Sequence, residues 1–210
     1  MFVVKTQYFY TTVAYSDRKM ARGNEYYLTL EEVKRIINAA NNLRDRLVIK
    51  LLARTGIRRS ELCAIRIQDV DHERKLIYIP HGKGGKPRSV PIDEDTLMDM
   101  KFYLGARHHG KLVQSNNTKT DGIDLSGINE IVRKTAEKAG VKHPDPARKH
   151  MNPHVFRHSF VRHLISLGMP PNYVQRLVGH ADIRTTLQIY GIPSFLDAQK
   201  KYDEMIKQMI

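Results

Sequence analysis

The chain has 210 residues, with 35 Lys and Arg against 22 Asp and Glu, a formal net charge of +13 and a pI near 9.8. This excess of positive charge is typical of a protein that binds a polyanion, and nucleic acid is the leading partner; charge that serves only solubility is the alternative. No apolar run approaches the roughly 18 residues of a membrane span, and a single cysteine, Cys63, excludes an intrachain disulfide, so we expect a soluble intracellular protein.

Composition changes along the chain predict three segments. Residues 1–24 are expected to form an N-terminal arm or linker, because an aromatic and β-branched stretch is followed by a polar, basic one. Residues 25–192 are expected to form the folded domain. Residues 193–210 have the periodicity of an amphipathic helix, whose apolar face must be buried somewhere.

The folded domain is predicted to begin with two helices. Thr29 and Glu32 have the spacing of a capping box, which predicts a helix from residue 30 to about residue 41. A second helix is predicted from Leu43 to Arg54, because Gly56 can adopt the left-handed conformation that commonly ends a helix. Cys63, on a short helix that follows, is expected to be a small buried hydrophobe.

A small antiparallel sheet is predicted next. Residues 75–80 and 87–92 read as two strands, joined by the glycine-rich, basic residues 81–86 at the tip of a hairpin. The other predicted elements are helices, over residues 60–65, 94–104, 126–139 and from Pro153, which Asn152 caps, to Gly168. The fold class expected from this pattern is mainly α with a small β-sheet.

The most informative residues lie near the C-terminus. His154 and Arg157 are three positions apart on a predicted helix and therefore share one face, where they can address one ligand. His180 and Tyr190 follow within the same part of the chain. Two imidazoles, a guanidinium and a phenol form a set that can bind a phosphate and supply a nucleophile.

Two other basic stretches are weaker evidence when taken alone. Arg58 and Arg59 lie between two helices, where their side chains should diverge by about 100°, so only one is expected to face a site. Lys83 lies between glycines that would let it approach a ligand closely, but this stretch lacks the spacing of a phosphate-binding P-loop.

Taken in order, four blocks of this sequence resemble the tyrosine recombinases, or phage-type integrases, of the Xer and lambda integrase kind. The resemblance covers about residues 26–192, the catalytic domain of that family. The four blocks are Thr55-Gly-Ile-Arg-Arg-Ser-Glu-Leu62, Gly82-Lys-Gly-Gly-Lys-Pro-Arg-Ser-Val-Pro91, His154-Val-Phe-Arg-His-Ser-Phe160, and Leu177-Val-Gly-His-Ala-Asp-Ile-Arg-Thr-Thr186 with Ile189-Tyr190.

The resemblance implies a role for each of six residues. Arg58 and Arg157 would clamp the nonbridging oxygens of a phosphodiester, and Tyr190 would be the nucleophile. His154 is the expected proton acceptor and Lys83 the expected proton donor to the leaving oxygen. His180 would hydrogen-bond the phosphate or the leaving oxygen. Contacts with the DNA backbone are expected from Arg59, Lys86 and Arg88.

The resemblance also implies the reaction and its partners. Attack by Tyr190 would give a covalent 3′-phosphotyrosyl link and a free 5′-hydroxyl, without a metal or nucleotide cofactor. The expected partner is double-stranded DNA, bound by a homotetramer in which residues 193–210 dock on a neighbouring protomer; packing of this helix on its own domain is the alternative. No membrane partner is expected.

Some alternatives remain open at this level. The fold could serve a catalytically silent DNA-binding module, or a type IB topoisomerase that relaxes supercoils with the same chemistry. Tyr173 is the nearest rival phenol but is expected to be a packing residue, and His158 and His163 are expected to have core or surface roles. Asp182 is expected to cap the helix that carries Tyr190.

Overall fold

A computed structural model describes residues 26–80, 87–116 and 121–179 of the chain. The predicted N-terminal arm, the hairpin tip, Asp182 and the predicted C-terminal helix lie outside the described residues. Within the described ranges, no helix is both long and apolar enough to cross a membrane.

The first two helices begin and end where local chemistry predicts. α1 (Leu30–Ala39) starts with the predicted capping box, in which Thr29 and Glu32 each bind the other's backbone N–H. α2 (Leu43–Thr55) ends at Gly56, whose φ of 62° is the left-handed conformation that favours glycine.

A three-stranded antiparallel sheet follows the short helix α3 (Arg59–Ala64). β2 (Leu76–Ile79) pairs with β3 (Arg88–Pro91), as predicted, and their buried and exposed residues alternate. β1 (Val70–Asp71) was not predicted, because two residues carry no periodic pattern and form a strand only by pairing with β2. The 3-10 helix η1 (Ile67–Asp69) leads into β1.

The remaining helices are capped by polar side chains at their N-termini or opened by proline. Asp93 caps α4 (Glu94–Leu104) and Asp124 caps α5 (Leu125–Lys138). Asn152 caps α6 (Pro153–Ser166), as predicted. α7 (Pro171–Val178) was not predicted, because its two leading prolines read as a break. Proline is nevertheless compatible with the first position of a helix, where no backbone N–H is needed.

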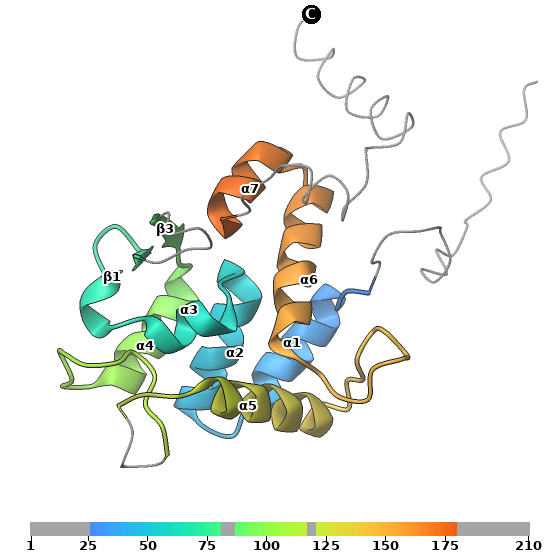
Figure 1. Cartoon of the computed structure of the whole chain (residues 1–210), viewed down its shortest axis with the longest axis horizontal. Helices are drawn as coiled ribbons and strands as arrows, with labels where there is room; N and C mark the ends of the chain where they lie inside the picture. Colours follow the sequence, from blue (N-terminus) through green and yellow to red (C-terminus); the bar gives the residue numbers. More distant parts are fainter. Residues whose placement is uncertain (1–25, 81–86, 117–120, 180–210) are drawn as a thin grey trace, which may run out of the picture.

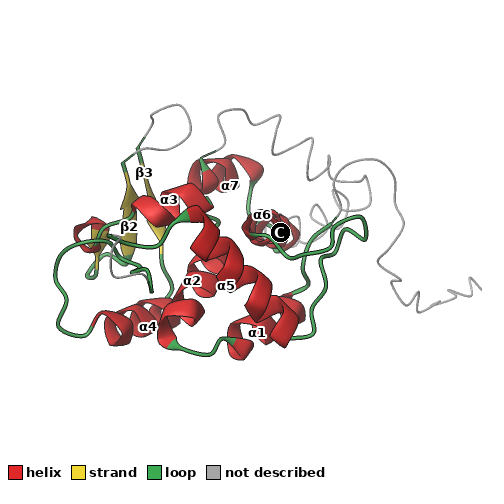
Figure 2. Ribbon diagram, turned by 60° about the horizontal axis from the view of Figure 1, so that its bottom comes forward, coloured by secondary structure: helices red, strands yellow, loops and turns green. Residues whose placement is uncertain are grey.

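The helices and the sheet enclose one large apolar core. α2 runs through its centre and packs against α1, α4, α5 and α6 (Figure 1). The sheet lies at one side of this helical body, and α7 packs against both β3 and α6 (Figures 1 and 2). Cys63 is half-buried at the edge of the core, and burial raises the pKa of its thiol. The structure thus confirms a mainly α fold with a small β-sheet.

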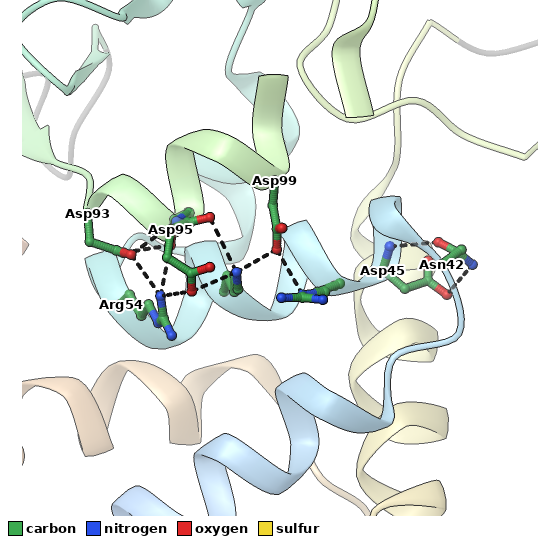
Figure 3. A network of polar contacts seen from close by, with 9 residues as sticks. Asn42, Asp45, Arg54, Asp93, Asp95 and Asp99 are labelled. Carbon is green, nitrogen blue, oxygen red and sulfur yellow. Dashed lines mark hydrogen bonds and ion pairs between the residues drawn. The ribbon is translucent and has the colours of Figure 1, made fainter. Parts of the chain in front are cut away.

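A network of ion pairs, buried at Lys50 and Asp99, joins α2 to α4 (Figure 3). Lys50 is fully buried, and its Nζ lies 2.5 Å from a carboxylate oxygen of Asp99 and 2.8 Å from one of Asp95. One turn further along α2, Arg54 contacts Asp93 and Asp95, each at 2.7 Å. A buried ammonium is tolerated only where it is paired and hydrogen-bonded, so this network fixes how α4 packs on α2.

We predict that Lys50→Met lowers the free energy of unfolding by about 3 kcal/mol, because it leaves Asp99 in the interior without its closest cation. Urea denaturation measures the change. The matched control is Lys134→Met, whose side chain is 68% exposed in its pair with Glu130; it should change stability by no more than about 0.5 kcal/mol. Equal effects of the two variants would show that the ion pairs of Lys50 contribute little to stability.

Candidate active site

A pocket of about 680 Å³ opens between the N-termini of α3 and α6 and the loop that precedes α6. It brings together three of the six predicted catalytic residues, Arg58, His154 and Arg157, from parts of the chain that are about a hundred positions apart. Tyr26, His143 and Arg148 complete much of its wall. The pocket is therefore rich in cationic and imidazole side chains.

The first turn of α6 places His154 and Arg157. Asn152 Oδ1 accepts hydrogen bonds from the backbone N–H groups of His154 at 3.0 Å and Val155 at 3.3 Å, which fixes where the helix begins. Arg157 lies one turn later on the same face and is 4% exposed. Its guanidinium donates to the backbone carbonyl of Gly56 and, at 2.6 Å, to that of Val178. Arg157 thus links the ends of α2 and α7.

Arg58 is held by a carboxylate that sequence reasoning missed. Its backbone N–H and its Nη1 donate to the two oxygens of Glu61, at 2.8 and 2.7 Å, and its Nη2 donates to the carbonyl of Gly179 at 3.0 Å. Glu61 is buried, which raises its pKa, but hydrogen bonds from Arg88 and Arg58 outweigh burial and lower the pKa to about 2. The spacing of Arg58 and Glu61, three positions apart at the start of α3, is the available sequence signal for this pair.

Two histidines share the wall of the pocket. The rings of His154 and His158 meet edge to face, with centroids 4.4 Å apart. Loss of solvation, together with the positive charges of Arg157 and Arg58, lowers the pKa of His154. Loss of solvation and the neighbouring His154 lower the pKa of His158 to about 4. Both imidazoles are therefore neutral at pH 7, the form that can accept a proton. His158, for which a core or surface role was expected, thus also lines the pocket.

The two arginines predicted to contact DNA lie in different surroundings. Arg59 is exposed, lines the pocket and donates to Asn129 of α5 at 3.0 Å. Arg58 lines the same pocket but donates to Glu61 and Gly179, so the two adjacent arginines have different partners. Arg88 has a 9% exposed side chain that donates to Glu61 and to the carbonyl of Leu177.

The other predicted site residues, Lys83, Lys86, His180 and Tyr190, lie outside the described residues, although α7 and Gly179 lead directly to His180. Tyr173 was expected to be a packing residue, which is wrong, because its side chain is 60% exposed on α7. His163 has the structural role that was expected: its Nε2 lies 2.8 Å from the carbonyl oxygen of Leu28.

Residues 26–195 match the model of the phage integrase family, which is most of the chain. The chain belongs to this family. Tyrosine recombinase XerA of Pyrococcus horikoshii is 36% identical over 166 residues, which cover 78% of this chain and 55% of the relative. Tyrosine recombinase XerC of Chromobacterium violaceum is 35% identical over 162 residues, 76% of this chain and 52% of the relative. The chain thus spans about half the length of these relatives.

Solved structures confirm the tyrosine recombinase catalytic-domain fold. The crystal structure of XerA recombinase superposes with a TM-score of 0.72 at 31% identity, covering 92% of this chain and 68% of that one. XerH site-specific recombinase bound to its difH substrate has a TM-score of 0.69 at 24% identity, covering 88% of this chain and 55% of that one. At this identity, the similarity to XerH shows a shared fold alone.

We predict that NMR titration of the histidine rings gives a midpoint of about 4 for His158 and one below 6.5 for His154. In urea-unfolded protein, histidines should titrate near the ordinary value of about 6.5. As the pH falls, the unfolded state therefore binds these protons before the folded state does. The contribution of the two histidines to the free energy of unfolding is fully present above about pH 6.5 and declines as the pH falls toward about 4. A folded-state midpoint near 6.5 for His158 would contradict the burial of this pair.

Proposed function

We propose that this protein breaks and rejoins DNA strands at specific sites through a covalent bond between Tyr190 and a 3′-phosphate. One observation carries the proposal: Arg58, Arg157 and a neutral His154 line the same pocket. The chain segment that leads to His180 and Tyr190 is hydrogen-bonded to both arginines, through Val178 and Gly179.

Two guanidiniums in one pocket suit a phosphodiester in its transition state. Negative charge builds on the nonbridging oxygens during attack, and charged donors already in place stabilise that charge without further reorganisation. Each guanidinium has five N–H donors, so an arginine can bind backbone carbonyls and a phosphate together. In this proposal, the carbonyl bonds of Arg58 and Arg157 orient both side chains before DNA binds.

The proton transfers follow from the charges of the groups. The Tyr190 oxygen forms a bond to phosphorus while the bond to the 5′-oxygen breaks. A phenol with a pKa near 10 needs a base, and the lowered pKa of His154 keeps that imidazole free to accept the proton. Lys83 gives a proton to the 5′-oxygen as it leaves. In the reverse direction a 5′-hydroxyl attacks the phosphotyrosine, and no external energy source is consumed.

Double-stranded DNA is the proposed partner, and a tetramer is the proposed assembly on it. The formal charge of +13 supports a polyanionic partner. Structures of recombinases bound to DNA, XerH with difH among them, add support from the same fold. Residues 193–210 would dock on the neighbouring protomer, and the mass of the DNA complex, with and without these residues, measures whether they do.

We predict that Tyr190→Phe abolishes covalent capture of DNA while leaving DNA affinity nearly unchanged, because the variant loses one hydroxyl and no charge. A library of nicked duplexes with a randomised sequence supplies the substrates, and an adduct that survives denaturing detergent is the readout. Sequencing the captured DNA then identifies the target site. An adduct that persists in Tyr190→Phe would assign the nucleophile to another phenol, with Tyr173 the first to test. Binding without capture by the wild-type protein would favour a catalytically silent DNA-binding module.

We predict that Arg58→Lys slows cleavage by roughly 10²–10³-fold, the usual loss when one donor to a developing oxyanion is removed. Lysine keeps the charge but cannot supply the planar donors that hold Glu61, Gly179 and a phosphate together. Single-turnover cleavage of the captured substrate gives the rate. Arg59→Lys is the matched comparison and should change affinity more than rate. The opposite result would mean that the clamp uses Arg59.

A further inference from the structure

Three consecutive carbonyls at the end of α7 each accept a hydrogen bond from an arginine of a different element. Arg88 on β3 donates to Leu177, Arg157 on α6 donates to Val178, and Arg58 at the start of α3 donates to Gly179. The last carbonyls of a helix have no partner within it and carry the negative end of its dipole. In the proposed reaction Arg58 and Arg157 bind the phosphate, whereas Arg88 has no role in the chemistry.

The surroundings of Arg88 differ from those of a side chain on a DNA-binding surface. Its Nη1 and Nη2 donate to the two oxygens of Glu61, each at 2.8 Å, and its Nε donates to the Leu177 carbonyl at 3.0 Å. The side chains of Arg88 and Glu61 are 9% and 4% exposed. All three nitrogens of this guanidinium are therefore used inside the protein.

Gly179 makes this packing possible. A Cβ at this position would lie 3.0 Å from Arg88 Cδ and 3.1 Å from its Nε and Nη1, which is too close for ordinary contact. The φ of Gly179 is also positive, at 67°, a conformation that side chains disfavour. The glycine at position 179 therefore allows the Arg88 side chain to lie close to the backbone just before His180.

Arg88 and Arg58 share one carboxylate. Both guanidiniums bind the same carboxylate of Glu61, whose pKa of about 2 keeps it charged. Without Arg88, Glu61 would be a buried carboxylate with one arginine, free to turn toward Arg58 and draw it out of position. The Leu177 carbonyl would lose its side-chain donor at the same time.

We propose that Arg88 is a positioning residue, which sets the Arg58 guanidinium and the end of α7 for reaction, and is not a contact to DNA. This inference rests on the proposed recombinase function. Along the chain, Arg88 follows the stretch that contains Lys83, and its carbonyl partner Leu177 precedes His180. Arg88 therefore couples β3, which follows the proposed proton donor Lys83, to α7, which precedes the proposed phosphate ligand His180.

The decisive measurement separates cleavage rate from DNA affinity. Arg88→Met should slow single-turnover cleavage of nicked DNA at saturating protein by roughly 10²-fold, the size of loss that a small misplacement of reacting groups causes. The dependence of affinity on salt should keep its slope, because no phosphate contact is removed. Arg74→Met, which removes an arginine whose side chain is 80% exposed, is the matched control and should leave the rate unchanged. Arg88→Lys should resemble Arg88→Met, because lysine cannot bind Glu61 with two parallel donors.

A double-mutant comparison tests whether Arg88 acts through Glu61. If it does, Arg88→Met combined with Glu61→Gln should cleave about as slowly as the slower single variant. Losses that multiply would mean independent roles and would overturn the proposal. So would a salt slope reduced by about one, with normal cleavage at saturating protein, since this is the result expected of a phosphate contact.

The pKa of Glu61 can be measured without any cleavage of DNA. It therefore tests the proposal even if the variants are inactive or the proposed function is wrong. In the carboxyl NMR spectrum, Arg88→Lys should raise the pKa of Glu61 above its value of about 2, because paired hydrogen bonds from Arg88 lower that pKa. An unchanged pKa in a cooperatively unfolding variant would overturn the proposed link. If wild-type protein binds DNA but never forms an adduct, the recombinase function fails, and the Glu61 pKa and the salt slope still decide whether Arg88 faces the protein or the DNA.

Discussion

The last turn of α7 has backbone carbonyls that no N–H of that helix can reach, and the site is arranged around satisfying them. Arg58, Arg88 and Arg157 supply the donors from three separate elements. Each of these arginines thereby gains a fixed direction. The same bonds hold the end of α7 to Arg58 and Arg157, which line the pocket. Hydrogen bonding to these carbonyls thus brings together residues that are more than a hundred positions apart, such as Arg58 and Gly179.

Glu61 balances the charge of this arrangement. Arg58 and Arg88 would repel each other across a short distance, and the buried carboxylate between them binds both. The remaining positive field acts on His154, whose pKa it lowers in concert with burial. The charges that suit the pocket to a phosphate therefore also keep the nearby imidazole neutral. One set of arginines would thus prepare both the proposed phosphate site and the proposed base.

The helical core supports this site through α2. Its central residues are buried against four other helices, and Lys50 joins α4 to it through a buried ion pair with Asp99 and a second pair with Asp95. Its end at Gly56 offers a carbonyl to Arg157, and a Cβ there would lie 2.5 Å from the ring of Phe160 on α6. The absence of a side chain at Gly56 thus lets α6 approach closely enough for Arg157 to reach both α2 and α7.

The sequence by itself determined the elements whose signals are local. The capping box at Thr29, the glycine that ends α2 and the Asn152–Pro153 start of α6 predicted their helices, because each depends on residues within one turn. The order of the motif blocks likewise identified the family, now shown by the match over residues 26–195. Only the tertiary structure decided what depends on distant partners. β1 exists through pairing with β2, and Glu61 and Arg88 gain their roles from groups up to 89 positions away. A long-range hydrogen bond leaves no periodic trace in a sequence, so an inward-facing arginine and a DNA-facing one look alike until the chain is folded.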